Sequence, residues 1–250
     1  NTIVANPCRI HTPGRGMNAT THRNIIPFDD TYILYDPDDV LSFLSAYFSL
    51  LPILILTFYL SWFIITRELE SCIIALGQLC NEIMNNIVKN IIKQDRPYWV
   101  GDSFQENSIR SGYGMPSAHS QFMGFTLSYF TLSLLVAPLS TNRKRSRFEA
   151  VSLFLILVVL SACVTFSRVY LHYHSVEQVL VGFTLGLFNG SAYLLVVRVI
   201  RSLGLWNWLL SWPIARILYM KDNFNLAPVT LKQEYESFWK TISSKSQKKE

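Results

Sequence analysis

The chain has 250 residues, of which 50% are hydrophobic and 16% are charged, with a formal net charge of +5 at pH 7. Soluble domains carry roughly 25% charged residues, so the composition excludes an ordinary soluble protein and predicts an integral membrane protein. The positive charge is clustered as on the cytosolic flanks of membrane segments, and no nucleic-acid-binding motif is present.

The N-terminal half begins with a polar arm over residues 1–40, which does not have the pattern of a cleavable signal peptide. The apolar run 41–66 predicts the first membrane helix, and Pro52 predicts a kink in it. Residues 71–94 predict a second helix, whose polar residues recur at helical spacing. We expect this polar stripe to face the interior of a helical bundle; it comprises Gln78, Glu82, Asn85, Lys89 and Lys93.

The series of apolar segments within residues 41–220 predicts an all-α integral membrane protein with five or six transmembrane helices. A polar loop is expected at 98–115, and the segment 203–220 is short and rich in Trp, which favours a helix at the membrane surface over a sixth span. Residues 221–250 are predicted to form a polar, partly disordered tail. The later membrane helices are expected at about 117–136, 149–166 and 175–199.

The helix order brings three polar motifs to one membrane face. The second helix ends between Lys89 and Arg96, the third begins at His119, and the fourth returns to the same side at Arg168. Most of the clustered arginines lie at the other face, which the positive-inside rule places in the cytosol. We therefore expect the motifs to face the lumen or the exterior, together with the glycosylation sequon at Asn18.

These motifs contain the residue types that bind and transfer a phosphate group. Lys89, Arg96 and Arg168 supply positive charge, and arginine offers a bidentate fork to phosphoryl oxygens. Ser117 is expected to cap the third helix, whose first amides point toward an anion. Two histidines, with a reference pKa of about 6.5, can act as nucleophile and proton donor. No carboxylate or histidine grouping has metal-ligand spacing, so we expect the cations to replace a metal and no cofactor to be needed.

Each residue alone has a simpler structural explanation. Lys89, near a helix end, can extend its ammonium to water, and Ser117 can be an ordinary helix cap. A single histidine is more often structural than catalytic. The gathering of all of them at one membrane face favours a functional site, because independent accidents would not be expected to fall together.

The three motifs resemble those of the type 2 phosphatidic acid phosphatase superfamily, whose pattern is K-x6-RP, PSGH and SR-x5-H-x3-D. Residues 89–97 match the first block, 116–119 match the second with Ala118 in place of Gly, and 167–174 match the third. The resemblance implies that His174 is the nucleophile, forming a phosphohistidine, and that His119 protonates the leaving group. It also implies that the phosphoryl oxygens are held by Lys89, Arg96, Ser117, Arg168 and the amides of Ala118 and His119.

One position departs from the family pattern. The Asp that would orient the nucleophilic histidine falls on Gln178, whose amide can hold the ring only by a neutral hydrogen bond. Glu177 is adjacent, about 100° around a helix, and can either face solvent or substitute. The sequence leaves open which of the two orients His174.

A finer resemblance, carried by 113–123 and 167–170 with Gln178, is to the dolichyl-diphosphate phosphatase branch. It implies hydrolysis of dolichyl diphosphate to dolichyl phosphate and phosphate at the lumenal face of the endoplasmic reticulum membrane, recycling the lipid carrier of N-glycosylation. The expected partners are this lipid and the membrane, without nucleic acid or an obligate protein partner. Two alternatives stay open: a phosphatase for phosphatidate or a sphingoid phosphate, and a non-catalytic lipid-phosphate binder, which Gln178 motivates.

Overall fold

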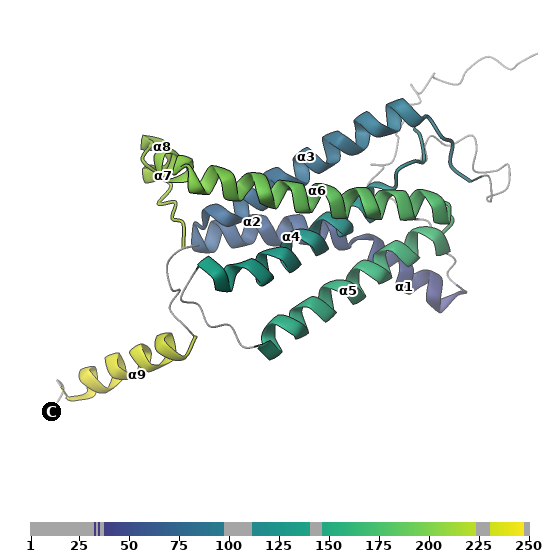
Figure 1. The fold of residues 1–250 in the computed structure, drawn as a ribbon. Helices are drawn as coiled ribbons and strands as arrows, with labels where there is room; N and C mark the ends of the chain where they lie inside the picture. Colours follow the sequence, from purple (N-terminus) through teal and green to yellow (C-terminus); the bar gives the residue numbers. More distant parts are fainter. Residues whose placement is uncertain are drawn as a thin grey trace, which may run out of the picture.

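The computed structural model describes residues 33, 35, 38–97, 112–140, 147–223 and 231–247. Among these residues the regular structure is helical, apart from one isolated bridge between Glu68 and Lys221, which confirms the all-α prediction. Helices α1 to α6 form a bundle, and three further helices follow it (Figure 1). The bounds are α1 Val40–Ser49, α2 Leu51–Thr66, α3 Leu69–Ile92, α4 Ala118–Ser140, α5 Arg147–Tyr170, α6 Val176–Ser202, α7 Leu205–Leu210, α8 Pro213–Ile217 and α9 Leu231–Gln247.

The first apolar run is divided into α1 and α2 at Leu50, close to Pro52, as the predicted kink requires. Pro52 lies in the first turn of α2, where the missing N–H removes no helical hydrogen bond. The start of α1 is capped by Asp39, whose carboxylate accepts the backbone N–H of Leu41 at 2.9 Å. The sequon at Asn18 and most of the expected arm lie outside the described residues.

Three helical stretches of the described residues are long and apolar enough to cross a membrane: Val40–Thr66, Phe148–Tyr170 and Val176–Ser202. Helices α3 and α4 have 24 and 23 residues. At about 1.5 Å per residue each is roughly 35 Å long, enough for the hydrocarbon core of a bilayer. They belong to the same bundle, and α3 is less apolar because its inward face carries polar side chains.

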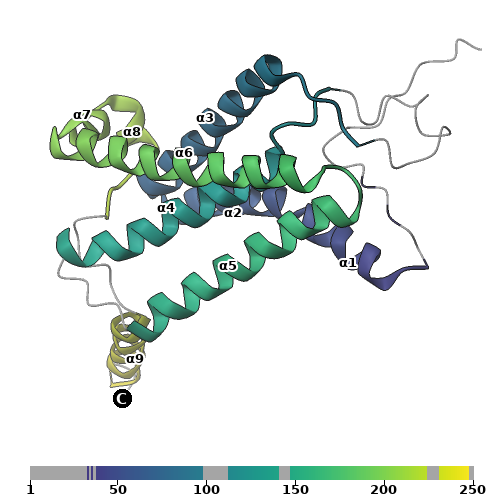
Figure 2. The ribbon, with the colours of Figure 1, turned by 45° about the vertical axis from the view of Figure 1, so that its right-hand side comes forward.

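Helix α6 packs tightly on α4 through glycines at every fourth position (Figures 1 and 2). A Cβ atom on Gly182 would lie 2.5 Å from the carbonyl oxygen of Ser117, and one on Gly186 would lie 2.1 Å from that of Gln121. Small residues permit such close approach of helix backbones in membranes. Because both partners advance by four residues, the two helices run parallel and the start of α6 lies beside the start of α4.

After α6 the chain forms α7 and α8, which are 6 and 5 residues long. At about 1.5 Å per residue neither can cross a bilayer, so 203–220 does not form a sixth span. The chain then returns to the start of α3, where Arg201 binds both Glu70 and Asp222 at 2.9 Å. This ion-paired cluster closes the end of the bundle at which α3 starts and α6 ends.

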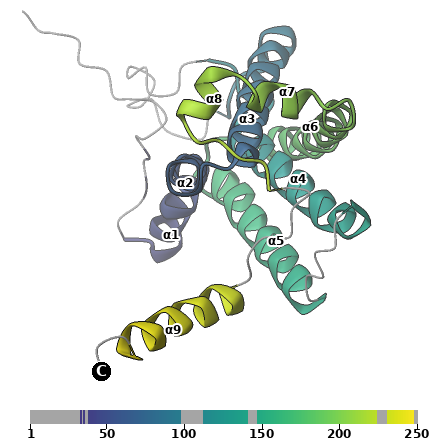
Figure 3. The ribbon, with the colours of Figure 1, turned by 90° about the vertical axis from the view of Figure 1, so that its left-hand side faces the viewer.

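Residues 231–247 of the predicted polar tail form a helix, α9, so the disorder expected for part of the tail does not apply to them. This helix projects away from the bundle (Figures 1 and 3). Tyr235, Phe238 and Trp239 are exposed on it at helical spacing. Disorder was expected from the overall polarity of the segment, whereas the spacing of its few apolar residues is that of an amphipathic helix.

Candidate active site

Three segments that are distant in sequence meet where α3 ends, α4 begins and α5 leads into α6 (Figures 1 and 2). The backbone N–H of Gly114 donates to the carbonyl of Gln94 at 2.7 Å, which joins the loop after α3 to the loop before α4. The backbone N–H of Ser117 donates to the carbonyl of Gln178 at 3.1 Å, which joins the start of α4 to α6. We call this region the site end, and the end that holds Arg201 the opposite end.

The two histidines belong to one charged cluster at the site end. His119 is the second residue of α4, and His174 is buried in the turn between α5 and α6. His119 interacts electrostatically with His174, and each of the two imidazoles also interacts with the charges of Lys89, Arg96 and Arg168. The residues singled out in the three sequence motifs are therefore brought to the same place.

The environment of His174 favours a neutral imidazole. Burial, together with the charges of Arg168 and Arg96, holds the pKa of His174 well below its usual range. The hydrogen bond with Gln178 acts in the opposite direction but does not outweigh burial. A neutral imidazole has an unprotonated ring nitrogen, which is what a nucleophile requires.

Gln178, rather than Glu177, contacts the nucleophile candidate. The Nδ1 atom of His174 lies 3.2 Å from Oε1 of Gln178, whereas Glu177 is exposed. The same oxygen accepts the backbone N–H of Ser175 at 3.3 Å, and Nε2 of Gln178 donates to the carbonyl of Asp95 at 2.8 Å. A backbone N–H only donates and a carbonyl only accepts, so the amide orientation is fixed. Oε1 therefore accepts the proton of Nδ1, and Nε2 of His174 is the unprotonated nitrogen.

Arg168 is fixed by residues of two other segments. Its Nη1 donates to Oγ of Ser49 in α1 at 3.1 Å, and its guanidinium lies over the ring of Tyr173 at 4.2 Å from the centroid. The backbone carbonyl of Arg168 accepts the N–H groups of Tyr173 and His174, each at 3.1 Å. The position of the guanidinium is thus coupled to the turn that carries His174.

Sequence reasoning missed Ser49 because it lies in an apolar run. The signal was present: Ser42, Ser45 and Ser49 recur at i, i+3 and i+7, and all three are buried on one face of α1. Ser49 also lies 3.1 Å from Ser167, between the hydroxyl oxygens. A stripe of small polar residues in a membrane helix indicates a face that packs against another helix.

The polar stripe of α3 is partly confirmed. Gln78 and Asn85 are buried, but Glu82 and Lys93 are exposed, and the buried series continues through Asn81 instead. This correction follows from helix geometry, because i, i+3 and i+7 place Gln78, Asn81 and Asn85 on one face, while Lys93 lies beyond the end of α3 in a left-handed conformation.

The buried members of the stripe connect α3 to α4. Asn85 Nδ2 donates to Oε1 of Gln121 at 2.7 Å, and Nε2 of Gln121 donates to Oδ1 of Asn81 at 2.8 Å. Asn85 Nδ2 also lies 3.4 Å from the carbonyl oxygen of Pro116, which it contacts as a donor. These amide contacts fix the start of α4 against the last turns of α3.

Ser117 lies directly before α4, in the position expected for a helix cap. Its carbonyl accepts the N–H of Gln121 at 3.0 Å, and its fully buried hydroxyl accepts that of Ser120 at 3.1 Å. Ala118 and His119 form the first turn of α4, so their amides lack partners from the helix itself. This arrangement can bind an anion at the start of α4.

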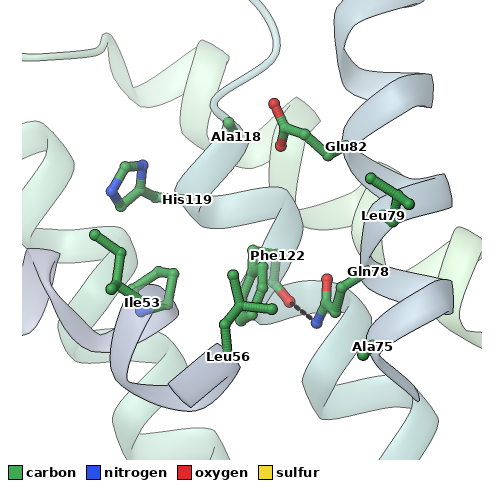
Figure 4. A pocket seen from close by; sticks show the side chains of 10 residues that line it. Ile53, Leu56, Ala75, Gln78, Leu79, Glu82, Ala118, His119 and Phe122 are labelled. Atoms are coloured by element: carbon green, nitrogen blue, oxygen red, sulfur yellow. Dashed lines mark hydrogen bonds between the residues drawn. The ribbon is translucent and has the colours of Figure 1, made fainter. Parts of the chain in front are cut away.

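A cavity of about 300 Å³ lies beside His119, between α2, α3 and α4 (Figure 4). Its wall is mainly apolar, with Gln78 and Glu82 as polar members on α3. In Figure 4 the imidazole of His119 and the side chain of Phe122 face this space. The other cavity-lining residues are Pro52, Ile53, Leu56, Ala75, Leu79 and Ala118.

Among the residues that the structure describes, no group of three or more His, Cys, Asp or Glu side chains is placed to hold a metal ion.

Comparison with known proteins identifies the family. The family model of the PAP2 superfamily matches residues 70–201, which include all three motifs. The chain belongs to the PAP2 superfamily. This confirms the resemblance to the type 2 phosphatidic acid phosphatases.

Within the PAP2 superfamily the chain has relatives that align over most of its length. Dolichyldiphosphatase of Saccharomyces cerevisiae is 61% identical over 236 residues, covering 92% of this chain and 97% of that protein. Dolichyldiphosphatase 1 of Homo sapiens is 31% identical over 211 residues, covering 84% of this chain and 86% of that protein. A similar solved structure is the transmembrane PAP2 type phosphatidylglycerolphosphate phosphatase of Bacillus subtilis, with a TM-score of 0.45, 23% identity and coverage of 62% and 73% of the two chains.

Proposed function

We propose that this chain is a membrane phosphatase that hydrolyses dolichyl diphosphate to dolichyl phosphate and phosphate. The observation that carries the proposal is the single cluster of two histidines and three cations, found in a chain 61% identical to yeast dolichyldiphosphatase. Cations around a phosphoryl group and a paired nucleophile and acid are what phosphoryl transfer requires. The substrate assignment rests on the relatives, and the chemistry rests on the cluster.

The first step forms a phosphohistidine. Nε2 of His174 attacks the terminal phosphorus, and the bond from that phosphorus to the bridging oxygen breaks. His119 gives its proton to the bridging oxygen, which leaves as dolichyl phosphate. Support for these roles comes from the burial that lowers the pKa of His174, from its Nδ1 contact with Gln178, and from the position of His119 in the same cluster.

The second step regenerates the enzyme. Water attacks the phosphorus of the phosphohistidine while His119 takes the proton that the water loses. The nitrogen–phosphorus bond breaks and phosphate leaves, so His174 returns to its neutral form and His119 to its protonated form. The cycle consumes one water and releases one phosphate, and each proton that His119 donates is recovered.

The cations bind the phosphoryl oxygens in both steps. Arg168 is suited to this because Ser49 and Tyr173 already hold its guanidinium, so little side-chain entropy is lost on binding. The start of α4 adds backbone donors that need no rearrangement. The proposed phosphoryl ligands are Lys89, Arg96, Ser117, Arg168 and the backbone amides of Ala118 and His119.

The cavity beside His119 is suited to the start of the dolichyl chain. It adjoins the residue that protonates the leaving group, and its wall is mainly apolar (Figure 4). Its volume of about 300 Å³ equals that of roughly ten water molecules in the liquid, or about two isoprene units if each heavy atom takes the space of one water. The rest of a long chain would then lie in the bilayer.

The site end is proposed to face the lumen of the endoplasmic reticulum. Arg67 follows α2, and Arg198 and Arg201 lie in the last turns of α6, all toward the opposite end. Positive charge marks the cytosolic side of membrane proteins. Residues 143–145, on which this assignment also drew, lie outside the described residues. A sequon introduced between residues 98 and 111 tests this topology, because it should be glycosylated only if that loop is lumenal.

A phosphate-release assay on the purified full-length chain tests the proposed substrate. We expect the highest kcat/KM for dolichyl diphosphate when it is compared with dolichyl phosphate, phosphatidate and a sphingoid phosphate. Faster release from phosphatidate or the sphingoid phosphate would refute the substrate but leave the chemistry in place. A folded chain that binds these lipids and releases phosphate from none would support the non-catalytic binder.

A further inference from the structure

Gln94 makes two hydrogen bonds at the site end, and the three motifs give it no role. It lies two residues before Arg96, at one of the positions that the family pattern leaves variable. Its side-chain Oε1 accepts Nε2 of Gln178 at 3.3 Å, and its backbone carbonyl accepts the N–H of Gly114 at 2.7 Å. The side chain of Gln94 is therefore directed at the residue that contacts His174.

The amide of Gln178 uses its entire hydrogen-bonding capacity. Oε1 faces Nδ1 of His174 at 3.2 Å and the N–H of Ser175 at 3.3 Å. The two hydrogens of Nε2 go to the carbonyl of Asp95 at 2.8 Å and to Oε1 of Gln94 at 3.3 Å. An amide offers two donors and one oxygen with two lone pairs, so no capacity remains.

An amide in this position needs a constraint that a carboxylate does not need. The two oxygens of a carboxylate are equivalent, so either one can accept the proton on Nδ1 of the histidine. An amide rotated by 180° would present its NH₂ group to His174 and favour the tautomer with the proton on Nε2. That nitrogen could then no longer attack, and an incorrect tautomer costs about 10⁴-fold in kcat in a serine protease.

We propose that Gln94 is a positioning residue that keeps Oε1 of Gln178 directed at His174. It acts together with the carbonyl of Asp95 and the N–H of Ser175, and the three contacts form a neutral relay that replaces the orienting carboxylate of the family pattern and maintains the reactive tautomer. This inference rests on the proposed function, because it assumes that His174 is the nucleophile. Gly114 adds a steric limit to the same relay, since a Cβ there would lie 2.7 Å from the amide nitrogen and oxygen of Gln178.

A purely structural role of Gln94 can be separated from the relay. The bond that joins the two loops uses the backbone carbonyl of Gln94, and a side-chain substitution leaves that group in place. A variant at this position therefore tests the contact to Gln178 and not the link to Gly114.

The experiment compares Gln94→Met, which has a similar shape but no acceptor, with Gln94→Glu, which retains the acceptor. With dolichyl diphosphate as the substrate of the full-length chain, we expect Gln94→Met to lower kcat about tenfold. This is the lower end of the losses known for residues that hydrogen-bond to, and orient, a metal-binding histidine. KM should stay within about twofold, because the relay acts on the nucleophile and not on the lipid. Gln94→Glu should recover most of the lost kcat.

The matched control is Asn90→Leu. Asn90 lies in the last turn of α3, four residues before Gln94, is exposed, and donates its amide to the carbonyl of Asn86 at 2.9 Å. The Asn90→Leu variant loses a side-chain amide of the same kind, but one that does not contact Gln178. The kcat of this variant should therefore equal that of the wild type. The melting temperature of each variant in detergent verifies that the chain is folded.

A double-mutant cycle shows whether Gln94 acts through Gln178. If it does, Gln94→Met combined with Gln178→Met should be no slower than Gln178→Met alone. Additive losses, an unchanged kcat in Gln94→Met, or a Gln94→Glu variant as slow as Gln94→Met would overturn the proposal. If the wild type released phosphate only from another lipid, the proposed substrate would be wrong, and the same variants on that lipid would still decide the role of Gln94.

Discussion

Both ends of the bundle gather polar groups, but they combine charge in opposite ways. At the opposite end, unlike charges meet, since Arg201 binds Glu70 and Asp222 at 2.9 Å. At the site end, like charges gather, since Lys89, Arg96 and Arg168 act on the same two imidazoles. The opposite-end cluster joins α3 to α6 and the segment after α8, whereas the site-end cluster draws its residues from α3, α4, α5 and the loops beside them.

The difference separates a structural cluster from a ligand-binding one. Paired opposite charges neutralise each other, so no ligand is needed to explain why they lie together. Removing one partner of such a pair lowers the stability of the fold. Cations held close together raise the free energy of the fold until an anion lies among them. Substitutions at the site end should therefore change catalysis, and substitutions at the opposite end should change stability.

The largest effect is expected for His174→Ala. The variant has no nitrogen to form the bond to phosphorus, so kcat for phosphate release should fall by at least about 10³-fold, as for other removed nucleophiles. Its melting temperature in detergent verifies that the variant is folded, and it should be somewhat lower than that of the wild type, because Oε1 of Gln178 loses one buried hydrogen-bond partner. Substrate labelled with ³²P at the terminal phosphate should leave label on the wild-type chain after an acid-free quench and none on the variant. A labelled, active His174→Ala protein would contradict the assignment.

The next effect is on stability and concerns Arg201→Met. Removing the guanidinium leaves Glu70 and Asp222 without their cation, which costs about 3 kcal/mol for a buried pair. Thermal unfolding in detergent should show a lower melting temperature, while kcat per folded molecule should be unchanged. Combining Arg201→Met with Glu70→Gln and Asp222→Asn should recover part of the loss. A normal melting temperature with reduced kcat would show that the two ends are coupled.

A smaller effect is expected for Arg168→Lys. The charge is kept, but the bidentate fork and the stacking on Tyr173 are lost. We expect kcat/KM to fall about 30-fold, corresponding to about 2 kcal/mol at 1.4 kcal/mol per factor of ten. Arg198→Lys, toward the opposite end, is the matched control and should retain the wild-type value. Equal losses in both variants would mean that the effect is not specific to the site.

Much of the fold could be predicted because membrane helices are defined by composition. The apolar run 41–66 and the break near Pro52 follow from local chemistry, whereas the number of membrane helices was predicted only as five or six. Helix α9 could not be obtained from overall polarity. The parallel packing of α4 and α6 could be inferred only from helix order. The spacing of the glycines on α6 indicates a close helix contact but does not specify which helix makes it.

The candidate site was predictable as a set of residues that lie together, but not as a network of contacts. Three motifs identified both histidines and the three cations, because spacing in those motifs is specific. Ser49 was missed since it contacts Arg168 across 119 residues of sequence. The choice between Glu177 and Gln178 depended on which side chain turned inward, and the contact of Gln94 depended on the path of a loop. Neither is encoded in residue type alone.

The dependence of stability on pH should distinguish the two ends further. The pKa of His174 is lowered by burial and by nearby cations, so the folded state resists taking up a proton. Above about pH 6.5 the residue is neutral in both states and contributes no pH dependence. Below that pH only the unfolded state is protonated, so stability should fall by up to about 1.4 kcal/mol per unit. The melting temperature of His174→Gln should fall less between pH 7 and 5 than that of the wild type, and parallel curves would contradict this account.

The smallest effect is expected from a chelator. If Lys89, Arg96 and Arg168 neutralise the phosphoryl oxygens, the positive charge belongs to the protein and EDTA cannot remove it. Phosphate release from dolichyl diphosphate should therefore be the same, within error, before and after treatment with EDTA. Arg168→Lys assayed with and without Mg²⁺ sharpens the test, because a metal that shared this role would partly restore the variant. Loss of wild-type activity in EDTA, with recovery on addition of Mg²⁺, would show that the like-charged cluster is not sufficient for phosphoryl transfer.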